Sequence, residues 1–175
     1  MDLKDYIRSI QDYPKKGILF RDITTLVKNE KAFKECINQI VDRTKKFKVD
    51  KIAAIESRGF VFASAVSYLI NKPFILLRKK NKLPAETHSV DFELEYGTAT
   101  IEVHKDSIKE NDSVLLIDDL IATGGTAEAA AKLIEISKGK VAAFIFVINL
   151  FDLGGCNDLI KKGHKVENLI EFPGH

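Results

Sequence analysis

Cysteine is scarce in this sequence, with only Cys36 and Cys156 among 175 residues. The two lie far apart and form no CxxC pair, and the 4 histidines show no metal-ligand spacing beside them. This pattern excludes a disulfide framework and a zinc-binding module. We therefore expect both thiols to be reduced and to serve a structural role.

Long apolar runs and a strong charge bias are also lacking. No apolar run approaches the roughly 18 residues of a membrane helix, and the first residues lack the basic and then apolar profile of a secretory signal. The 27 Lys and Arg residues are nearly balanced by 25 Asp and Glu residues, and the net charge of +2 gives no field that would capture nucleic acid or an anionic membrane. We expect a cytoplasmic protein that binds neither nucleic acid nor a membrane.

No linker or repeat divides the chain, because its 4 prolines are scattered and no tract rich in Gly, Ser or Pro occurs. Hydrophobic residues make up 45% and charged residues 30%, which is typical of folded domains. A chain of this length can bury most of its surface around one core. Residues 1–175 are therefore expected to form a single domain.

The hydrophobic pattern alternates between helix and strand. Apolar residues at helical spacing predict a helix over 31–47, and the short apolar run at 51–55 predicts a buried strand. The pattern continues with a helix at 60–70, strands at 74–77 and 114–117, a helix at 126–137, and a strand at 141–150. Such alternation predicts a doubly wound α/β fold, in which helices flank a mostly parallel sheet. Ligands of such folds bind beyond the carboxyl ends of the strands.

One stretch breaks this alternation. Alternate residues from Val90 to Tyr96 are apolar, and another strand-like run follows at 98–103, which predicts an antiparallel excursion. Residues 79–89 before it are polar and basic and contain Pro84. These features are typical of an exposed mobile loop.

The most informative segment is residues 114–126, VLLIDDLIATGGT, which precede a helix-forming run at 127–131. A strand leads through an acidic pair and a loop of small residues into a helix. Glycines let the backbone approach a ligand closely, and a helix N-terminus offers free N–H groups and a positive dipole to an anion. No lysine follows the glycines, so the segment is not a Walker A loop.

Asp118 and Asp119 predict a second kind of ligand group, a hydrogen-bond donor rather than an anion. Two carboxylates beside an anion site are suited to accept hydrogen bonds from the vicinal hydroxyls of a sugar. The glycine loop and the acidic pair together fit a sugar phosphate. The alternative is structural, with Gly124 and Gly125 forming a turn and the aspartates capping the helix.

Residues 115–126 resemble the signature by which type I phosphoribosyltransferases bind 5-phosphoribosyl 1-pyrophosphate (PRPP). The resemblance implies that family's fold, with a small base-binding hood at residues 1–30 and a mobile catalytic loop at 79–95. It implies that Asp118 and Asp119 bind the ribose 2- and 3-hydroxyls. The residues implied to bind the 5-phosphate are Ala122, Thr123, Gly124, Gly125 and Thr126.

Residues 12–24, DYPKKGILFRDIT, resemble the base-binding segment of the adenine-specific members of that family. The resemblance implies that main-chain groups of Leu19 and Arg21 read the adenine edge while Phe20 stacks on the ring. An aromatic face with a few fixed hydrogen bonds suits a flat heterocycle. The alternative is a surface turn with Phe20 packed in the core.

Residues 54–60, AIESRGF, are similar to the pyrophosphate loop of the family. The resemblance implies a cis peptide bond between Glu56 and Ser57, and it implies that Ser57 and Arg58 hold the leaving pyrophosphate. Taken without the resemblance, the segment predicts only the start of a helix.

Residues 77–84, LRKKNKLP, resemble the beginning of the family's mobile loop. By this resemblance Arg78 and Lys82 contact pyrophosphate, and Arg78 could reach the site of a neighbouring subunit. The alternative is a solvated basic loop. The chain departs from the family in two places: Ala85 replaces the usual glycine after the loop proline, and residues 153–157 lack an arginine, so we assign no site residue there.

Residues 94–97, LEYG, resemble the other flank of the same loop. The resemblance implies that closure of the loop carries Glu95 over the base as a general acid or base, with Tyr96 near the ribose. Glu95 could instead be a charge on the surface of a strand. The catalytic roles implied by the resemblance therefore belong to Glu95, Arg58 and Lys82.

The resemblance as a whole implies purine salvage, in which the phosphoribosyl group of PRPP passes to adenine to give AMP and pyrophosphate. Mg²⁺ would be bound mainly through PRPP and pyrophosphate, with no metal site built by protein side chains alone, and a homodimer is expected. Two alternatives stay open. One is a phosphoribosyltransferase for a 6-oxopurine, and the other is a regulator that binds PRPP without reacting it.

Overall fold

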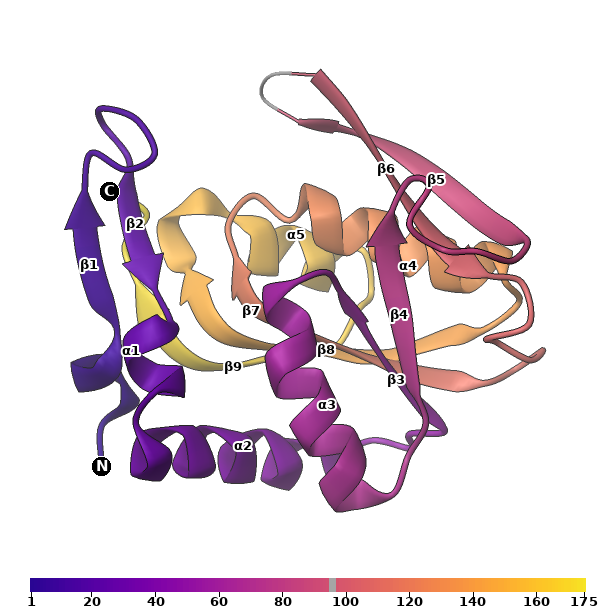
Figure 1. Ribbon diagram of the computed structural model, residues 1–175, viewed down its shortest axis with the longest axis horizontal. Coiled ribbons are helices and arrows are strands. Elements are labelled where there is room, and N and C mark those ends of the chain that lie inside the picture. The colour runs from indigo at the N-terminus through magenta and orange to yellow at the C-terminus, as the bar shows by residue number, and fades with distance from the viewer. Residues whose placement is uncertain (95–96) are drawn as a thin grey trace.

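The computed structural model describes residues 1–94 and 97–175. The strands of its large sheet are β3 (Lys51–Ile55), β4 (Phe74–Lys79), β5 (Thr87–Leu94), β6 (Gly97–His104), β7 (Ser113–Ile121), β8 (Lys140–Leu150) and β9 (Val166–Phe172). They lie in the order β5-β6-β4-β3-β7-β8-β9 (Figure 1). The five strands from β4 to β9 in this order are parallel, whereas β5 and β6 are antiparallel to their neighbours. The predicted doubly wound α/β fold is therefore confirmed.

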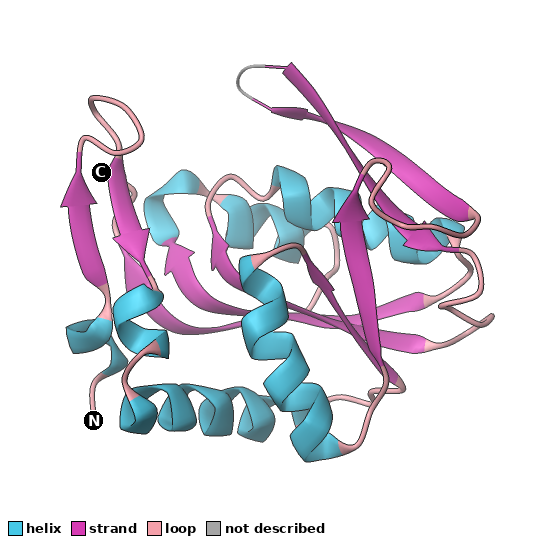
Figure 2. Ribbon diagram, viewed as in Figure 1, coloured by secondary structure: helices cyan, strands magenta, loops and turns pink. Residues whose placement is uncertain are grey.

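Helices cover both faces of this sheet (Figure 2). They are α2 (Glu30–Thr44), α3 (Arg58–Ile70), α4 (Gly125–Ile136) and α5 (Gly155–Lys161). The first two helices pack on one face, where Phe62 of α3 shares a core cluster with Leu115. The other two pack on the opposite face, where Leu133 of α4 shares a second cluster with Phe144. Because both faces are covered, the central strands are apolar along nearly their whole length.

The predicted elements are present, but several have different ends. α3 begins at Arg58 rather than at residue 60, and α2 ends at Thr44 rather than at residue 47. β7 does not stop at Ile117 but continues through the acidic pair to Ile121, which pairs with β8. The sequence predicted an earlier end because the two aspartates interrupt the apolar pattern. The length of β7 depends instead on its hydrogen bonding to the neighbouring strand β8.

The predicted antiparallel excursion is the hairpin of β5 and β6. β6 also pairs with β4, with Arg78 opposite Glu102. The connection between β4 and β5 spans residues 80–86, so the predicted exposed loop at 79–89 is shorter than expected. The strand begins early because Val90 and Phe92 pack against the second core cluster.

The hood, residues 1–30, contains the elements η1 (Leu3–Tyr6), β1 (Arg8–Gln11), β2 (Leu19–Asp22) and α1 (Thr24–Val27). β1 and β2 form an antiparallel sheet of their own, with Ser9 opposite Arg21. Leu3, Ile7 and Leu26 nevertheless belong to the first core cluster. The hood therefore shares the hydrophobic core of the large sheet.

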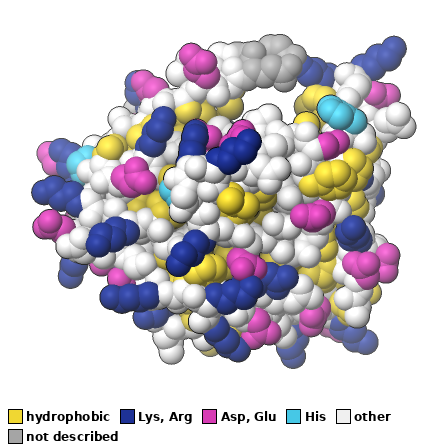
Figure 3. Space-filling view, turned by 180° about the vertical axis from the view of Figure 1, so that it is seen from behind, with side chains coloured by type: hydrophobic (Ala, Val, Ile, Leu, Met, Phe, Trp, Pro, Cys, Tyr) yellow, Lys and Arg dark blue, Asp and Glu magenta, His cyan; other side chains and the backbone are white. Residues whose placement is uncertain are grey.

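The surface and the cysteines agree with an ordinary folded domain. On the face seen in Figure 3, Lys and Arg side chains are mixed with Asp and Glu. Within residues 1–94 and 97–175, none of the helices combines the length and hydropathy needed to cross a membrane.

Cys36 and Cys156 are both free and buried, and burial raises the pKa of their thiols to about 12 and about 11. The expectation of reduced, structural cysteines is confirmed for this structure.

Candidate active site

The carboxyl ends of β3 and β7 lie side by side, and the chain continues from them to opposite faces of the sheet. The two strands are parallel neighbours, with Ala53 opposite Leu116. β3 leads into α3 on one face of the sheet, and β7 leads into α4 on the other. Such a switch point opens a crevice that binds ligands in α/β sheets.

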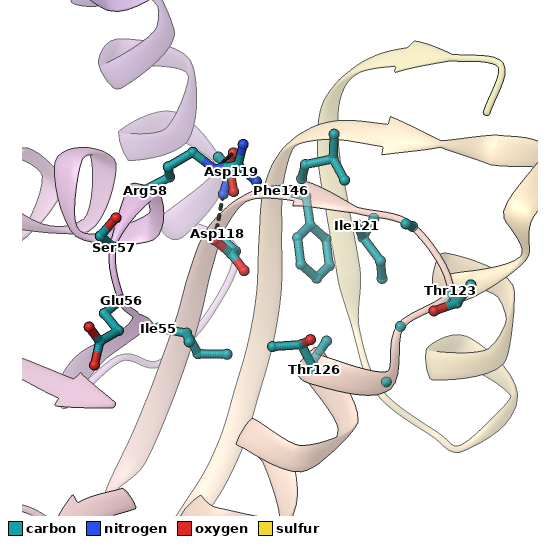
Figure 4. A pocket seen from close by; sticks show the side chains of 15 residues that line it. Ile55, Glu56, Ser57, Arg58, Asp118, Asp119, Ile121, Thr123, Thr126 and Phe146 are labelled. Carbon is teal, nitrogen blue, oxygen red and sulfur yellow. Dashed lines mark hydrogen bonds and ion pairs between the residues drawn. The ribbon is translucent and has the colours of Figure 1, made fainter. Parts of the chain in front are cut away.

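A cavity of about 420 Å³ lies at this switch point (Figure 4). One wall follows β3 and the other is formed by the end of β7 and the loop after it. The predicted site residues that line it are Ser57, Arg58, Asp118, Asp119, Ala122, Thr123, Gly124, Gly125 and Thr126. The structure thus brings together two segments that are about 60 residues apart in the sequence.

The anion loop, residues 122–126, has the backbone of a helix start. Gly124 has φ of +89°, a left-handed conformation that glycine adopts without strain. The N–H of Glu128 donates to the carbonyl of Gly124 at 2.9 Å and closes the first turn of α4. The N–H groups of Gly125 and Thr126 lie in that first turn, where the helix itself provides no acceptors. The loop is therefore suited to bind an anion.

Gly155 is a residue of this site that sequence reasoning missed. Its N–H donates to the carbonyl of Ala122 at 3.1 Å. A side chain there would place its Cβ 2.4 Å from that carbonyl oxygen and 2.8 Å from the nitrogen of Gly124. Only glycine lets α5 approach the anion loop this closely. The sequence did show a glycine pair at 154–155, but nothing in it indicated what the pair contacts.

The segment after β3 forms the opposite wall. The peptide bond between Glu56 and Ser57 is cis, which confirms that expectation. Ser57 and Arg58 are exposed to the cavity at the start of α3. The next residue, Gly59, is buried, and a Cβ on it would lie 2.9 Å from Oδ1 of Asp118. The close approach of α3 to β7 therefore also requires a glycine.

An acidic pair and one arginine form the centre of the site. Oδ1 of Asp118 accepts the main-chain N–H of Asp119 at 2.8 Å, and Nε of Arg58 lies 2.9 Å from Oδ2 of Asp119. Burial raises the pKa of Asp118 well above its ordinary value, and the charge of Asp119 raises it further. Burial also raises the pKa of Asp119, although Arg58 opposes this effect. Ionisation of the two carboxyl groups is therefore unfavourable, and hydrogen bonds donated by a ligand would favour the ionised form.

Two predicted pyrophosphate residues lie outside the lining of this cavity. Arg78, at the end of β4, is partly buried and lies 3.3 Å from the carboxylate of Glu56. Lys82 is exposed on the loop between β4 and β5, and its carbonyl accepts a bond from Arg78. Glu56, which sequence reasoning did not select, links the segment after β3 to the end of β4, because its carboxylate also accepts the N–H of Lys79 at 2.7 Å.

The predicted base-binding residues lie on β2 of the hood. Leu19 and Phe20 are partly buried, and Arg21 is buried. The guanidinium of Arg58 lies 5.5 Å from the centre of the Phe20 ring, within the range of a cation–π contact. Arg58 thus connects the hood to the cavity. The alternative of Phe20 enclosed in the core is not what the structure shows.

Other features of the site escaped the sequence or lie beyond the described part. Phe146 of β8 lines the cavity opposite Asp118, which a sequence without strand register could not indicate. Glu95 and Tyr96, the predicted acid or base and its neighbour, lie outside the described residues. Among the residues that the structure does describe, no group of His, Cys, Asp and Glu is arranged to hold a metal ion.

Comparison with known proteins identifies the family. The family profile described as "Phosphoribosyl transferase domain" matches residues 22–168. The chain is 80% identical to adenine phosphoribosyltransferase of Pelagibacter ubique, over the full length of both chains. It is 51% identical to the protein of the same name from Nitrosospira multiformis, again over the whole of both.

Solved structures give the same result. The crystal structure of adenine phosphoribosyltransferase from Thermoanaerobacter pseudethanolicus superposes with a TM-score of 0.93 at 45% identity, covering 97% of this chain and 98% of that one. The Saccharomyces cerevisiae protein, solved with an imino-altritol bisphosphate and adenine, has a TM-score of 0.88 at 32% identity and covers 96% of both chains. On this evidence, and with the anion loop and acidic pair in place, the chain belongs to the phosphoribosyltransferase family, on its adenine phosphoribosyltransferase branch.

Proposed function

We propose that this protein transfers the 5-phosphoribosyl group of PRPP to adenine, giving AMP and pyrophosphate in purine salvage. The observation that carries the proposal is the cavity at the switch point. It has an anion loop at one end, an acidic pair in the middle and Arg58 on the opposite wall. Adenine is supported by the relatives, which are adenine phosphoribosyltransferases, and by the yeast structure, which was solved in complex with adenine.

The two halves of the cavity suit the two ends of PRPP. The free N–H groups and hydroxyls of the anion loop would hold the 5-phosphate, and Asp118 and Asp119 would accept hydrogen bonds from the ribose hydroxyls. Breaking the bond to pyrophosphate builds positive charge on the ribose and negative charge on the leaving group. Ser57 and Arg58 would stabilise that leaving group, with Arg78 and Lys82 joining them. A preorganised donor of this kind typically contributes about 3 to 4 kcal/mol.

Mg²⁺ is the cofactor that we propose. Its preference for oxygen ligands and retained water fits one or two carboxylates together with substrate oxygens, and Asp118 and Asp119 supply such carboxylates in the cavity. The ion would neutralise charge on the pyrophosphate.

For the base, we propose that Phe20 stacks on adenine while main-chain groups of Leu19 and Arg21 read its edge. β2 suits this role because β1 pairs with only one of its edges. Residues 79–95 would close over the bound substrates and exclude water. Glu95 would then move a proton at N7 of the base, and Tyr96 would lie near the ribose.

We also propose a cytoplasmic homodimer. The outer side of α3 exposes Val61, Tyr68 and Leu69, and Tyr68 is 83% exposed. Leu76 of β4 is also exposed, and it shares a sheet face with Phe74, which packs on Phe60 of α3. Contiguous exposed apolar side chains mark interaction sites, and a two-fold pair is the commonest assembly. Sedimentation of the purified protein tests this, because a monomer at micromolar concentration would contradict it.

The first experiment offers adenine, hypoxanthine, guanine and xanthine separately to the purified protein with PRPP and Mg²⁺. AMP formed from adenine alone is the expected result. Turnover of an oxopurine instead would keep the PRPP site but refute the assignment of the hood. Binding of PRPP without turnover of any base would support the alternative of a regulator.

A further inference from the structure

The Arg21 side chain is buried in the hood without a carboxylate partner. It is 7% exposed, and among the described residues its polar contacts are to Ser9 and the carbonyl of Pro173, the latter at 3.0 Å. Its guanidinium also lies 4.5 Å from the centre of the Phe172 ring. Burial lowers the pKa of Arg21, and its buried Nε has no hydrogen-bond partner among the described residues. A buried cation of this kind needs an explanation, because it costs stability.

The position of Arg21 suggests an explanation for this buried charge. The hood sheet has two strands and forms no ladder with the seven-stranded sheet, and such a pair is only marginally stable alone. Tertiary contacts must therefore fix where β2 lies. Two side chains of β2 reach outside the hood: Phe20 contacts Arg58 beside the cavity, and Arg21 contacts Phe172 and Pro173 in the segment 172–174, near the C-terminal end of the chain.

The far end of this segment is fixed near the anion loop. The N–H of Gly174 donates to Oδ1 of Asp152 at 2.5 Å. A Cβ on Gly174 would lie 2.6 Å from Cγ of Leu153, so the segment is pressed against η2 (Phe151–Leu153). Two residues later, Gly155 donates to the carbonyl of Ala122 in the anion loop. In Figure 1 the C-terminal end of the chain lies beside β1 and β2.

We propose that the Arg21 side chain is a positioning residue for the base. Through residues 172–174 and Asp152, it holds the main chain of β2 at a fixed separation from the anion loop. This inference rests on the proposed function and adds to it a role for a side chain outside the cavity. The separation matters because the base nitrogen and the ribose carbon must meet at about 3 to 3.5 Å, and an error of about 1 Å can cost on the order of 10²-fold in rate.

The test compares three variants with the wild type. Arg21→Met keeps the length and apolar contacts of the side chain but removes its donors and charge. Asp152→Ala releases Gly174 at the other end of the same contact chain. Arg43→Met is the matched control, since Arg43 is a partly buried arginine on α2 whose polar contacts, among the described residues, are to Glu167 and the carbonyl of Gln39.

We expect Arg21→Met to raise the KM for adenine about tenfold or more, because the base site is displaced. The KM for PRPP should stay within about twofold, because the anion loop and acidic pair are untouched. Asp152→Ala should shift the same constant in the same direction, and the double variant should show less than the sum of the two effects, since both act on one chain of contacts. Arg43→Met should change neither constant.

An unchanged adenine KM in both Arg21→Met and Asp152→Ala, with both proteins folded by circular dichroism, would refute the inference. Parallel rises in both KM values would also refute it. If Arg21→Met does not fold, Asp152→Ala decides alone. Wild-type protein that does not use adenine would refute the proposed function instead. In that case amide hydrogen exchange at residues 19–21, which should quicken in Asp152→Ala but not in Arg43→Met, still tests the inference.

Discussion

Nε of Arg58, the first residue of α3, lies 2.9 Å from Oδ2 of Asp119, near the end of β7. The contact joins the two walls of the cavity. Asp119 is 4% exposed, so its carboxylate depends on this arginine for compensation of its charge. Replacements of Arg58 and Asp118 test this acidic site, and a replacement of Gly155 tests the anion loop beside it.

Replacing Arg58 with Gln should make PRPP binding depend more strongly on pH. Burial raises the pKa of Asp119 and Arg58 lowers it, so losing the arginine should raise that pKa further. Because the proposed acceptor is the ionised carboxylate, PRPP affinity should fall as the pH is lowered, and the fall should begin at a higher pH than in the wild type. Calorimetric titration with PRPP at several pH values measures this. An identical pH profile in both proteins would contradict the coupling.

Replacing Asp118 with Asn should stabilise the folded protein while weakening PRPP binding. The folded-state pKa of Asp118 is raised, so its ionisation on going to neutral pH opposes folding. The variant should therefore melt at a higher temperature than the wild type at pH 7. The difference should shrink as the pH falls toward the ordinary carboxyl pKa of about 4, and it should vanish below that pH, where the wild-type group is protonated in both states.

PRPP affinity of the Asp118→Asn variant should fall about tenfold or more, as is typical for the loss of a hydrogen bond to a charged group. Thermal unfolding at several pH values and titration with PRPP give the two readouts. A variant that is less stable than the wild type at pH 7 would show that the carboxylate is better compensated than its burial indicates.

Replacing Gly155 with Ala should damage the anion loop. The added Cβ would lie 2.4 Å from the carbonyl oxygen of Ala122, so the loop or α5 must move. Overpacking of this kind typically costs about 1 to 3 kcal/mol in the free energy of unfolding. PRPP affinity should fall as well, because the N–H groups of the loop change direction.

Gly163→Ala is the matched control for that experiment. Gly163 has φ of +90°, but a Cβ there meets no atom within 4 Å. Its replacement should cost about 1 to 2 kcal/mol through backbone strain alone and leave PRPP affinity unchanged. Equal losses of PRPP affinity in the two variants would contradict a specific role for the close packing of Gly155 against the anion loop.

Replacing Glu95 with Gln should lower kcat about 10² to 10⁴-fold if the residue moves a proton at the base. The pH dependence of kcat should change with it, since the titrating carboxyl is lost. Steady-state kinetics with adenine over a range of pH values tests this. Near-normal turnover with the same pH profile would refute this role and favour the alternative that the sequence also allows, in which Glu95 is only a surface charge.

The local part of the site was predictable from the sequence because neighbouring residues build it. A strand, an acidic pair, a glycine loop and a helix follow one another over residues 114–126, and their order is enough to indicate an anion site beside a hydroxyl site. The order of helices and strands likewise predicted the fold class, since covered parallel strands must be apolar. The resemblance to a family added the proposed roles of Phe20, Ser57 and Arg58, which stay predictions.

Contacts between distant segments were decided only by the tertiary structure. The end of β7 at Ile121 depends on pairing with β8, and the short connection at 80–86 depends on how β5 packs against α4. The need for Gly155 comes from a helix that lies about 30 residues beyond the anion loop in the sequence. The place of Arg21 depends on Phe172 and Pro173, at the other end of the chain. Hydrophobic periodicity determines which face of an element is buried, but the partner it meets depends on close packing of the whole chain, and no local pattern carries that information.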